Sequence, residues 1–265
     1  MLKIAISGAA GRMGARLIVL GHSDPDISIV SAIEANDHPK LGQDSGLSSG
    51  IDQNSVPFQS SFPEDLDVVI DFSHPPGAEA AVNHCLHWKT PLVMATTGLT
   101  DSTIALMQKG SEEIPIVWAP SMSLAVNLSM KMVEMAGQAL KNHASGVDVE
   151  IIERHHRYKA DSPSGTALKF GEIVGQAMGI DQHVHGREGM VGERPRNEIG
   201  YHAVRTGDNP GQHTIVFGML GETIELKVSA SNRDCYASGA LSAAKFVTSQ
   251  TPGLYNMYDV LGLND

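Results

Sequence analysis

Short apolar runs alternate with amphipathic stretches along the first half of the chain. Residues 2–7 alternate and end at a glycine, which is typical of a buried strand, and residues 13–20 carry the apolar spacing of a helix. The same pattern predicts strands at 27–33, 67–72, 91–95 and 114–118, helices at 76–88 and 101–112, and loop over most of 36–63 with one short strand at 56–59. Because strands separated by helices of this length form parallel βαβ units, we expect a doubly wound, Rossmann-like parallel sheet.

The pattern changes in the second half of the chain. A long, Met-rich helix is predicted at 123–142, followed by a strand at 147–153 and a helix at 164–178. Strands at 198–205, 213–220 and 223–229 then follow one another across short turns, and a helix is predicted at 238–250. Because short links favour antiparallel pairing, we expect a second, smaller α+β domain, so that the fold class is α/β with this addition.

Composition narrows the class of protein. The 265 residues are 42% hydrophobic and 18% charged with 27 glycines, which is typical of a soluble globular α/β chain. The formal net charge of -11 excludes the broad basic face needed for nucleic acid or an anionic membrane. Two distant cysteines, no signal-like N-terminus and no apolar stretch of ~20 residues predict a cytoplasmic protein without disulfides or membrane spans.

A glycine turn follows the first predicted strand and opens the first predicted helix. Gly8, Gly11 and Gly14 lie in SGAAGRMG, where backbone N–H groups can hold a pyrophosphate. The spacing G-x-x-G-x-x-G differs from the standard G-x-G-x-x-G and is a weak signal alone. Glu34 strengthens it, because this carboxylate ends the second strand about 20 residues later, where it can bind an adenosine ribose.

The residues around this carboxylate indicate which dinucleotide binds. Glu34 would repel a ribose 2′-phosphate, and Ala35 stands where a basic side chain would suit NADP. We therefore expect NADH to be preferred, with NADPH possible because Lys40 could reach a phosphate.

The stretch ERHHRYKADSPSGTALK, residues 153–169, gathers two histidines and four cations in an acidic chain. On an extended strand His155 would share a face with Glu153, and His156 would point to the other face. Lys159 would lie ~13 Å beyond His155 at this extension. The two side chains can therefore reach one ligand only if the chain bends back after the strand.

The following residues predict that bend. Asp161 and Pro163 are turn formers, and Ser164 is a suitable cap for a helix that begins beside it. The free N–H groups of Gly165 and Thr166 would then attract a carboxylate or phosphate, which predicts a pocket for a small polyanion. Taken singly, adjacent histidines and charge runs are more typical of a solvated surface. A metal site is not expected, because adjacent histidines lack ligand spacing and no cysteine pair is near.

This stretch resembles the E-x-H-H-x-x-K-x-D-x-P-S-G-T-A signature of the 4-hydroxy-tetrahydrodipicolinate reductases, also called dihydrodipicolinate reductases. The signature is long and specific. The resemblance extends in order along nearly the whole chain, through GAAGRMG near the start, DFSHP at 71–75, TTG at 96–98, GREGMVGER at 186–194, HT at 213–214 and YDVLGL in the tail.

The resemblance implies an NAD(P)H-dependent reduction of a small cyclic dicarboxylate in the diaminopimelate route to lysine. By the family pattern, His155 donates or accepts a proton, Lys159 is a second proton donor, and His156 contacts the substrate. Gly165 and Thr166 would bind a substrate carboxylate. The implied cofactor contacts are Gly8, Ala9, Ala10, Gly11, Arg12, Met13, Glu34, Ala95, Thr96, Thr97, Ala119, Pro120, Ser121 and Met122.

The sequence patterns indicate two domains, and the resemblance implies that the C-terminal segment returns to the first domain and that the protein is a homotetramer. The expected dinucleotide-binding domain is 1–126, with 236–265 returning to it, and the expected substrate-binding and oligomerisation domain is 127–235. A homotetramer assembled through the sheets of the substrate domains is expected.

The chain departs from the family pattern at the nicotinamide side. Ala95 stands where glycine is common, and Ser121 and Met122 replace an Asn and a Phe. These changes bear on cofactor contacts more than on the activity, since backbone groups can serve there and Met can fill the space of an aromatic ring.

Two alternative functions remain open. Another Rossmann dehydrogenase acting on an amino or keto dicarboxylic acid would share the glycine turn and Glu34 but would not need HHRYK followed by PSGT. A dinucleotide-sensing protein without catalysis would need neither His155 nor Lys159 as a proton donor.

Overall fold

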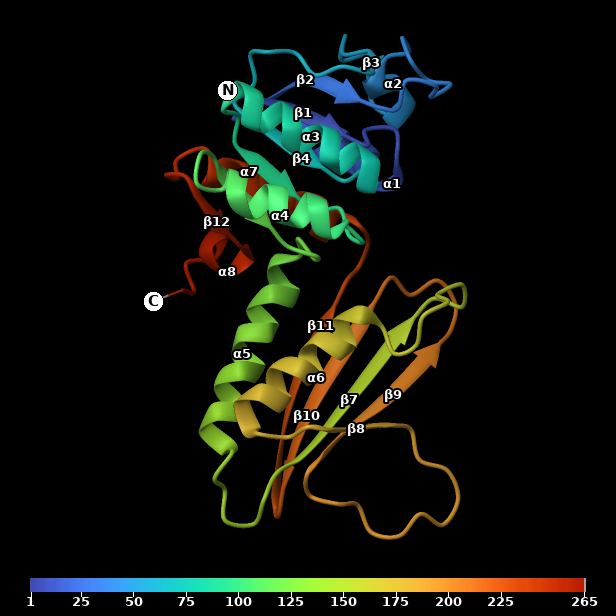
Figure 1. Ribbon diagram of the computed structural model, residues 1–265. Coiled ribbons are helices and arrows are strands. Elements are labelled where there is room, and N and C mark those ends of the chain that lie inside the picture. Colours follow the sequence, from blue (N-terminus) through green and yellow to red (C-terminus); the bar gives the residue numbers. More distant parts are fainter. Residues whose placement is uncertain (265) are drawn as a thin grey trace. The chain divides into compact units, whose positions relative to one another are not determined.

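The chain divides into two compact units in the computed structural model, which describes residues 1–264 (Figure 1). Unit 1 contains Met1–Leu124 and the chain from Arg233 onward, and unit 2 contains Ala125–Asn232. No helix in the described residues is both long enough and apolar enough to span a lipid bilayer.

Unit 1 is built on a seven-stranded sheet in the order β12-β6-β5-β4-β1-β2-β3, in which all pairs are parallel. The strands are β1 Leu2–Ser7, β2 Ile27–Ile33, β3 Phe58–Gln59, β4 Val68–Asp71, β5 Leu92–Met94, β6 Pro115–Trp118 and β12 Gly253–Tyr255. The helices are α1 Arg12–His22, α2 Ser45–Ser49, α3 Pro75–Trp88, α4 Asp101–Gly110, α7 Asp234–Val247 and α8 Met257–Val260. The predicted doubly wound, Rossmann-like sheet is confirmed.

The alternation in β1 places side chains on two different helix layers. Ile4 and Ile6 lie in a buried cluster with apolar residues of α1 and α7. Ala5 lies in a second cluster with residues of α3 and α4 on the other face of the sheet (Figure 1). A strand buried on both faces must be apolar throughout, which is why these strands read as short, nearly continuous hydrophobic runs.

Unit 2 is built on a mixed five-stranded sheet in the order β11-β10-β7-β9-β8. The strands are β7 Asp148–His155, β8 Gln182–His185, β9 Glu198–Arg205, β10 Gln212–Met219 and β11 Glu222–Ser229, and the helices are α5 Leu124–Leu140 and α6 Gly165–Met178. This unit confirms the predicted smaller α+β domain, and β10 and β11 form the expected antiparallel pair.

The expected pairing of β9 with β10 is wrong, because β7 lies between them. β9 runs parallel to β7, whereas β10 runs antiparallel to β7 on its other side. The link between β9 and β10 crosses the end of β7 and is fixed there by hydrogen bonds from Thr206 N to His155 O (2.9 Å) and from Arg157 N to Gly207 O (3.0 Å). A short link is typical of a hairpin, but here it spans one intervening strand and brings polar residues to the end of β7.

Four short elements were missed by the sequence patterns. Helix α2, with Asp44 as its N-cap, lies in the predicted loop 36–63, and β8, β12 and α8 were not predicted. Each is five residues or shorter, so none contains enough positions to establish a hydrophobic period.

Candidate active site

The predicted cofactor residues lie at one edge of the parallel sheet in unit 1. The turns that follow β1, β2, β5 and β6 carry them, and the carboxyl ends of parallel strands share one sheet edge. Ala9, Ala95, Thr96, Ala119 and Met122 are buried, Gly8, Ala10, Met13, Glu34 and Ser121 are partly exposed, and Gly11, Arg12, Thr97 and Pro120 are exposed. The tertiary structure thus brings all of these residues to the edge where α/β sheets bind ligands.

The glycine turn after β1 has the backbone that a phosphate site requires. Gly8 has φ +75°, and a Cβ on Gly14 would lie 2.3 Å from the Gly8 carbonyl oxygen. Only glycine fits both positions. Gly11 caps α1 without a side-chain hydrogen bond, so the first N–H groups of this helix are not occupied by a cap. The turn and helix start therefore suit a pyrophosphate.

Glu34 lies immediately after β2 and holds the glycine turn. Its Oε1 accepts a hydrogen bond from Ala10 N at 2.7 Å. The carboxylate retains further acceptor capacity for a ribose hydroxyl. Glu34 also borders a pocket of about 340 Å³, whose other lining residues are Ser7, Gly8, Ile33, Ala35, Asn36, Ser60, Phe62, Ser73, His74, Pro76, Gly77 and Ala80. Two of these lining residues, Ser73 and His74, lie in the DFSHP segment that resembles the family. No sequence motif indicated Ser60 or Phe62.

A buried carboxylate supports the neighbouring turn and was also missed. Asp71 ends β4 and is fully buried. It accepts hydrogen bonds from Thr96 Oγ1 and from Ser73 Oγ, the latter at 2.9 Å. Burial raises the pKa of Asp71, although hydrogen bonds from neighbouring hydroxyl groups oppose the shift. Asp71 therefore anchors Thr96, a predicted cofactor contact, to the central strands.

The turn after β6 departs from the expected side-chain contacts. Met122 is only 1% exposed and belongs to the core of unit 1. A Cβ on Gly239 of α7 would lie 1.7 Å from the Met122 carbonyl oxygen, so the helix backbone packs directly against this turn. The Met122 side chain therefore fills the core, and only the backbone of Met122 remains for a ligand.

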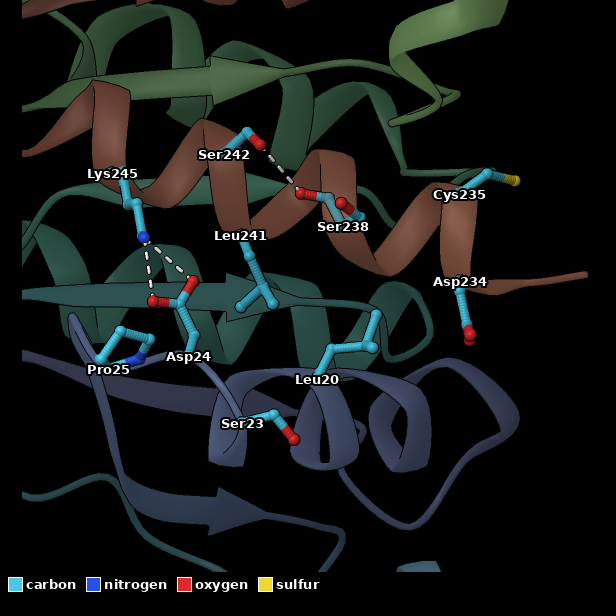
Figure 2. Close-up of a pocket in the computed structure, with 10 residues that line it drawn as sticks. All are labelled: Leu20, Ser23, Asp24, Pro25, Asp234, Cys235, Ser238, Leu241, Ser242 and Lys245. Carbon is cyan, nitrogen blue, oxygen red and sulfur yellow. Dashed lines mark hydrogen bonds and ion pairs between the residues drawn. The ribbon is translucent and has the colours of Figure 1, made fainter.

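A larger pocket of about 660 Å³ in unit 1 lies between α1 and α7 and contains none of the predicted residues (Figure 2). Lys245 lies on its wall and forms ion pairs with Asp24 (2.9 Å) and Asp26 (3.0 Å). The cation is thus neutralised within the protein, and we assign this pocket no role in the reaction.

In unit 2, strand β7 ends at His155 and the chain bends back at once. Lys159 N donates to His156 O at 3.2 Å, which closes a turn directly after the strand. Burial is the largest cause that lowers the pKa of His155, and the positive charge of Lys159 acts in the same direction. The bend that the spacing of the two residues demanded is therefore present. Lys159 Nζ pairs with Asp161 Oδ1 at 2.8 Å.

His155 is held by a carboxylate two residues before it on the strand. Its Nδ1 lies 2.6 Å from Glu153 Oε2, and the two residues are 8% and 1% exposed. Burial lowers the pKa of His155, and the hydrogen bond to Glu153 opposes this shift. Burial also disfavours ionised Glu153, but hydrogen bonds from Arg205 and His155 outweigh it and hold its pKa below the usual value.

Ser164 connects this histidine to the start of α6. Its N–H donates to Glu153 Oε1 at 3.1 Å, and its Oγ accepts from Ala167 N at 3.2 Å as the helix N-cap. Burial lowers the pKa of His213 to about 4. The neutral ring can therefore accept a hydrogen bond at Nε2 from the Ser164 hydroxyl, at an Oγ–Nε2 distance of 2.9 Å. The helix start is thereby fixed relative to His155.

The remaining predicted substrate residues lie on the exposed side of this segment. Gly165 is exposed, and no heavy atom lies within 4 Å of the position where its Cβ would be. Thr166 and His156 are partly exposed, and His156 Nδ1 has no hydrogen-bond partner within residues 1–264. Open N–H groups at a helix start beside an imidazole and an ammonium can bind a small dicarboxylate.

Arg205 and His213 were missed as members of this cluster. Arg205 lies opposite His155 in the β7–β9 pairing, and His213 lies opposite Glu153 in the β7–β10 pairing. Both are about 50 residues or more from their partners in sequence, and only strand register brings them together. HT at 213–214 belonged to the resemblance, but no pattern indicated a contact with His155.

A second charged cluster occupies the other face of β7. Glu150 accepts hydrogen bonds from Arg187 and Arg194, each at 2.8 Å to Oε1, and its Oε2 lies 2.7 Å from His202 Nε2. Burial disfavours ionised Glu150, but these hydrogen bonds lower its pKa to about 2. The cluster ties the segment that contains GREGMVGER to the sheet and does not include the predicted site residues.

Comparisons with known proteins cover the entire chain. The family model for "Dihydrodipicolinate reductase, N-terminus" matches residues 2–122, and that for "Dihydrodipicolinate reductase, C-terminus" matches residues 125–261. The 4-hydroxy-tetrahydrodipicolinate reductase of Rhodopirellula baltica is 56% identical over 100% of this chain and 97% of its own. That of Syntrophotalea carbinolica is 42% identical over 99% of this chain and 100% of its own.

A solved structure shares the fold. The dipicolinate-bound dihydrodipicolinate reductase from Paenisporosarcina sp. TG-14 matches with a TM-score of 0.77 and 24% identity, over 98% of each chain. An amine dehydrogenase from Mycobacterium smegmatis matches with a TM-score of 0.61 at 12% identity, which shows a similar fold alone. On the family matches and the full-length identities, the chain belongs to the dihydrodipicolinate reductases, the 4-hydroxy-tetrahydrodipicolinate reductase family.

Proposed function

We propose that this protein reduces 4-hydroxy-tetrahydrodipicolinate to tetrahydrodipicolinate in the diaminopimelate pathway of lysine biosynthesis, with His155 and Lys159 as proton donors. The activity is that of the family, an NAD(P)H-dependent oxidoreductase. One observation carries the assignment of residues. A buried, carboxylate-bound imidazole stands at the end of β7 and is tied through Ser164 to an open helix start.

The substrate carries two carboxylates, and unit 2 offers a matching set of groups. We propose that one carboxylate accepts hydrogen bonds from the N–H groups of Gly165 and Thr166, and that His156 contacts the substrate. Lys159 adds positive charge beside them. The exposed position of Gly165, the partly exposed ring of His156 and the lack of a hydrogen-bond partner for its Nδ1 within residues 1–264 support this arrangement.

The reduction consumes one hydride and one proton and releases water. The nicotinamide cofactor, when bound, supplies the hydride to the unsaturated ring. His155 supplies the proton to the carbon framework, which an imidazole can do near neutral pH. Lys159 stabilises negative charge on the substrate and can act as a second proton donor. Loss of the substrate hydroxyl together with one ring hydrogen as water creates a double bond, and the hydride and the proton then saturate that bond, so atoms and electrons balance.

The cofactor site lies in unit 1, and its residues fit a dinucleotide. We propose that the pyrophosphate binds the turn Gly8 to Met13, that Glu34 binds the ribose, and that Ala95 to Thr97 and Ala119 to Met122 lie at the nicotinamide side. The uncapped start of α1 and the pocket beside Glu34 support this placement.

We expect NADH to be the better reductant, because ionised Glu34 would repel a 2′-phosphate and exposed Ala35 supplies no positive charge. Synthase-coupled assays should give a kcat/KM for NADH at least about 10-fold above that for NADPH, since placing two like charges next to each other costs at least one factor of ten. Ala35→Arg should improve NADPH use while leaving kcat with NADH nearly unchanged.

An Ala35→Gln variant is the matched control for size without charge. Absence of NADH or NADPH oxidation with the synthase product would contradict the reductase activity, whereas equal kcat/KM values for the two cofactors would contradict only the preference for NADH.

We also propose a cytoplasmic homotetramer assembled through the sheets of unit 2. Strand β7 buries alternate residues toward α6, whereas Ile152 and Val204, which lie diagonally across the β7–β9 pair, are each 42% exposed on the other face. Such a face suits self-association. Sedimentation equilibrium should give about four times the 28.2 kDa chain mass, and a monomer at assay concentrations would contradict the assembly.

A further inference from the structure

Glu153 is a buried carboxylate to which the reduction itself gives no role. It is 1% exposed and receives four hydrogen bonds. Arg205 donates two of them in a bidentate pair, Nη1 to Oε2 at 2.8 Å and Nη2 to Oε1 at 2.7 Å. Ser164 N and His155 Nδ1 provide the other two, at 3.1 and 2.6 Å. Every lone-pair direction that a buried carboxylate commonly uses is thus occupied.

The charge state of Glu153 determines how its bond to His155 is made. The bidentate Arg205 keeps the carboxylate ionised, and an ionised carboxylate only accepts hydrogen bonds. His155 Nδ1 must therefore carry a hydrogen, whether the ring is neutral or charged. In the neutral ring Nε2 is then the free acceptor, and in the protonated ring it carries the proton that can leave.

The surroundings of Nε2 agree with this assignment. A Cβ on Gly211 would lie 3.0 Å from His155 Nε2, so the Gly211 backbone lies beside this nitrogen and a larger residue there would crowd it. The other charged or titratable groups that act on the ring are Lys159, Arg205 and His213. The two cations disfavour protonation of His155, and the neutral His213 adds no negative charge. Glu153 is thus the carboxylate that favours the protonated ring.

We propose that Glu153 is a positioning residue that fixes the Nδ1–H tautomer of His155, so that Nε2 delivers the proton consumed in the reduction. The inference rests on the proposed role of His155 as proton donor. A purely structural role is the alternative, in which Glu153 only ties β7 to β9 through Arg205. That role would move neither the tautomer of His155 nor the pH dependence of the reaction.

The tautomer of His155 can be measured without substrate. In the full-length protein with ¹⁵N-labelled histidine, we expect the neutral His155 ring to carry its hydrogen on Nδ1. A neutral ring protonated on Nε2 would overturn the proposal. This measurement needs neither a variant nor activity, so it remains decisive even if a substitution prevents folding.

Glu153→Gln tests the link to catalysis. Ser164 N and Arg205 Nη2 can only donate to the Oε1 position, so the amide oxygen of this variant takes that position and its NH₂ group faces Nδ1. We therefore expect the Nδ1–H tautomer to be lost. We expect kcat to fall about 10- to 100-fold, the range of a lost charge-assisted hydrogen bond. The protonated ring also loses its anionic partner, which lowers the pKa of His155. The alkaline limb of the kcat profile should therefore move to lower pH.

Glu150→Gln is the matched control, because Glu150 lies on the same strand and also pairs with arginines and a histidine, but on the opposite face. It should leave the His155 tautomer and the alkaline limb in place. Unchanged tautomer and pH profile in Glu153→Gln would overturn the proposal. A changed tautomer with an unchanged rate would instead overturn His155 as the proton donor, and hence that part of the proposed function.

Discussion

Replacing His155 with alanine should reduce kcat about 100- to 10,000-fold, the usual contribution of a positioned general acid. KM for the dicarboxylate should change little, because the proposed binding groups are the N–H groups at the start of α6 and the cations beside them. Steady-state kinetics with the synthase product and NADH would measure both constants.

His143→Ala is a suitable control, because this exposed histidine lies after α5 and its side chain contacts Ser145 Oγ, at 3.0 Å from Nδ1. It should retain wild-type kcat. A His155→Ala enzyme with wild-type kcat would show that the proton comes from another group.

Replacing Lys159 should produce the second large effect and separate its two possible roles. Lys159→Ala removes both a proton and a positive charge, so kcat should fall about 100-fold or more and KM should rise. Lys159→Arg keeps the charge, but arginine does not release its proton in this pH range. If Lys159 donates a proton, Lys159→Arg should retain KM and still lose about 100-fold in kcat.

A wild-type kcat in Lys159→Arg would show that Lys159 acts by its charge alone. Asp161→Asn serves as a control for the ion pair, because Asp161 Oδ1 lies 2.8 Å from Lys159 Nζ in the protein. This variant leaves the ammonium in place and should not reproduce the loss of kcat.

Both predictions depend on how His155 and Lys159 are placed, and local sequence patterns predicted only part of that placement. The spacing of His155 and Lys159 required a bend after the strand, and β7 does end at His155. The cap at Ser164 was also predictable, because serine before a helical apolar pattern is a standard start signal. The buried partners Arg205 and His213 were not predictable, since strand register, unlike helix periodicity, is a property of chain segments far apart in sequence.

The sequence by itself determined the elements and much of the chemistry of this protein. The bounds of β1, β2 and β9 are those predicted, because alternation, apolar runs and turn residues act over a few positions. The glycine turn, Glu34 and the HHRYK…PSGT segment are likewise local features, and together they carry the resemblance to the family.

Only the tertiary structure decided how these pieces meet. Insertion of β7 between β9 and β10 overturned the expected pairing, because a short link can either form a hairpin or cross one strand end. That crossing places Arg205 and His213 beside Glu153 and His155. Local sequence determines which groups are present and how the chain turns, but the burial and the partners of a titratable group depend on residues brought together from across the fold. The charge state and tautomer of His155 are therefore set by the fold.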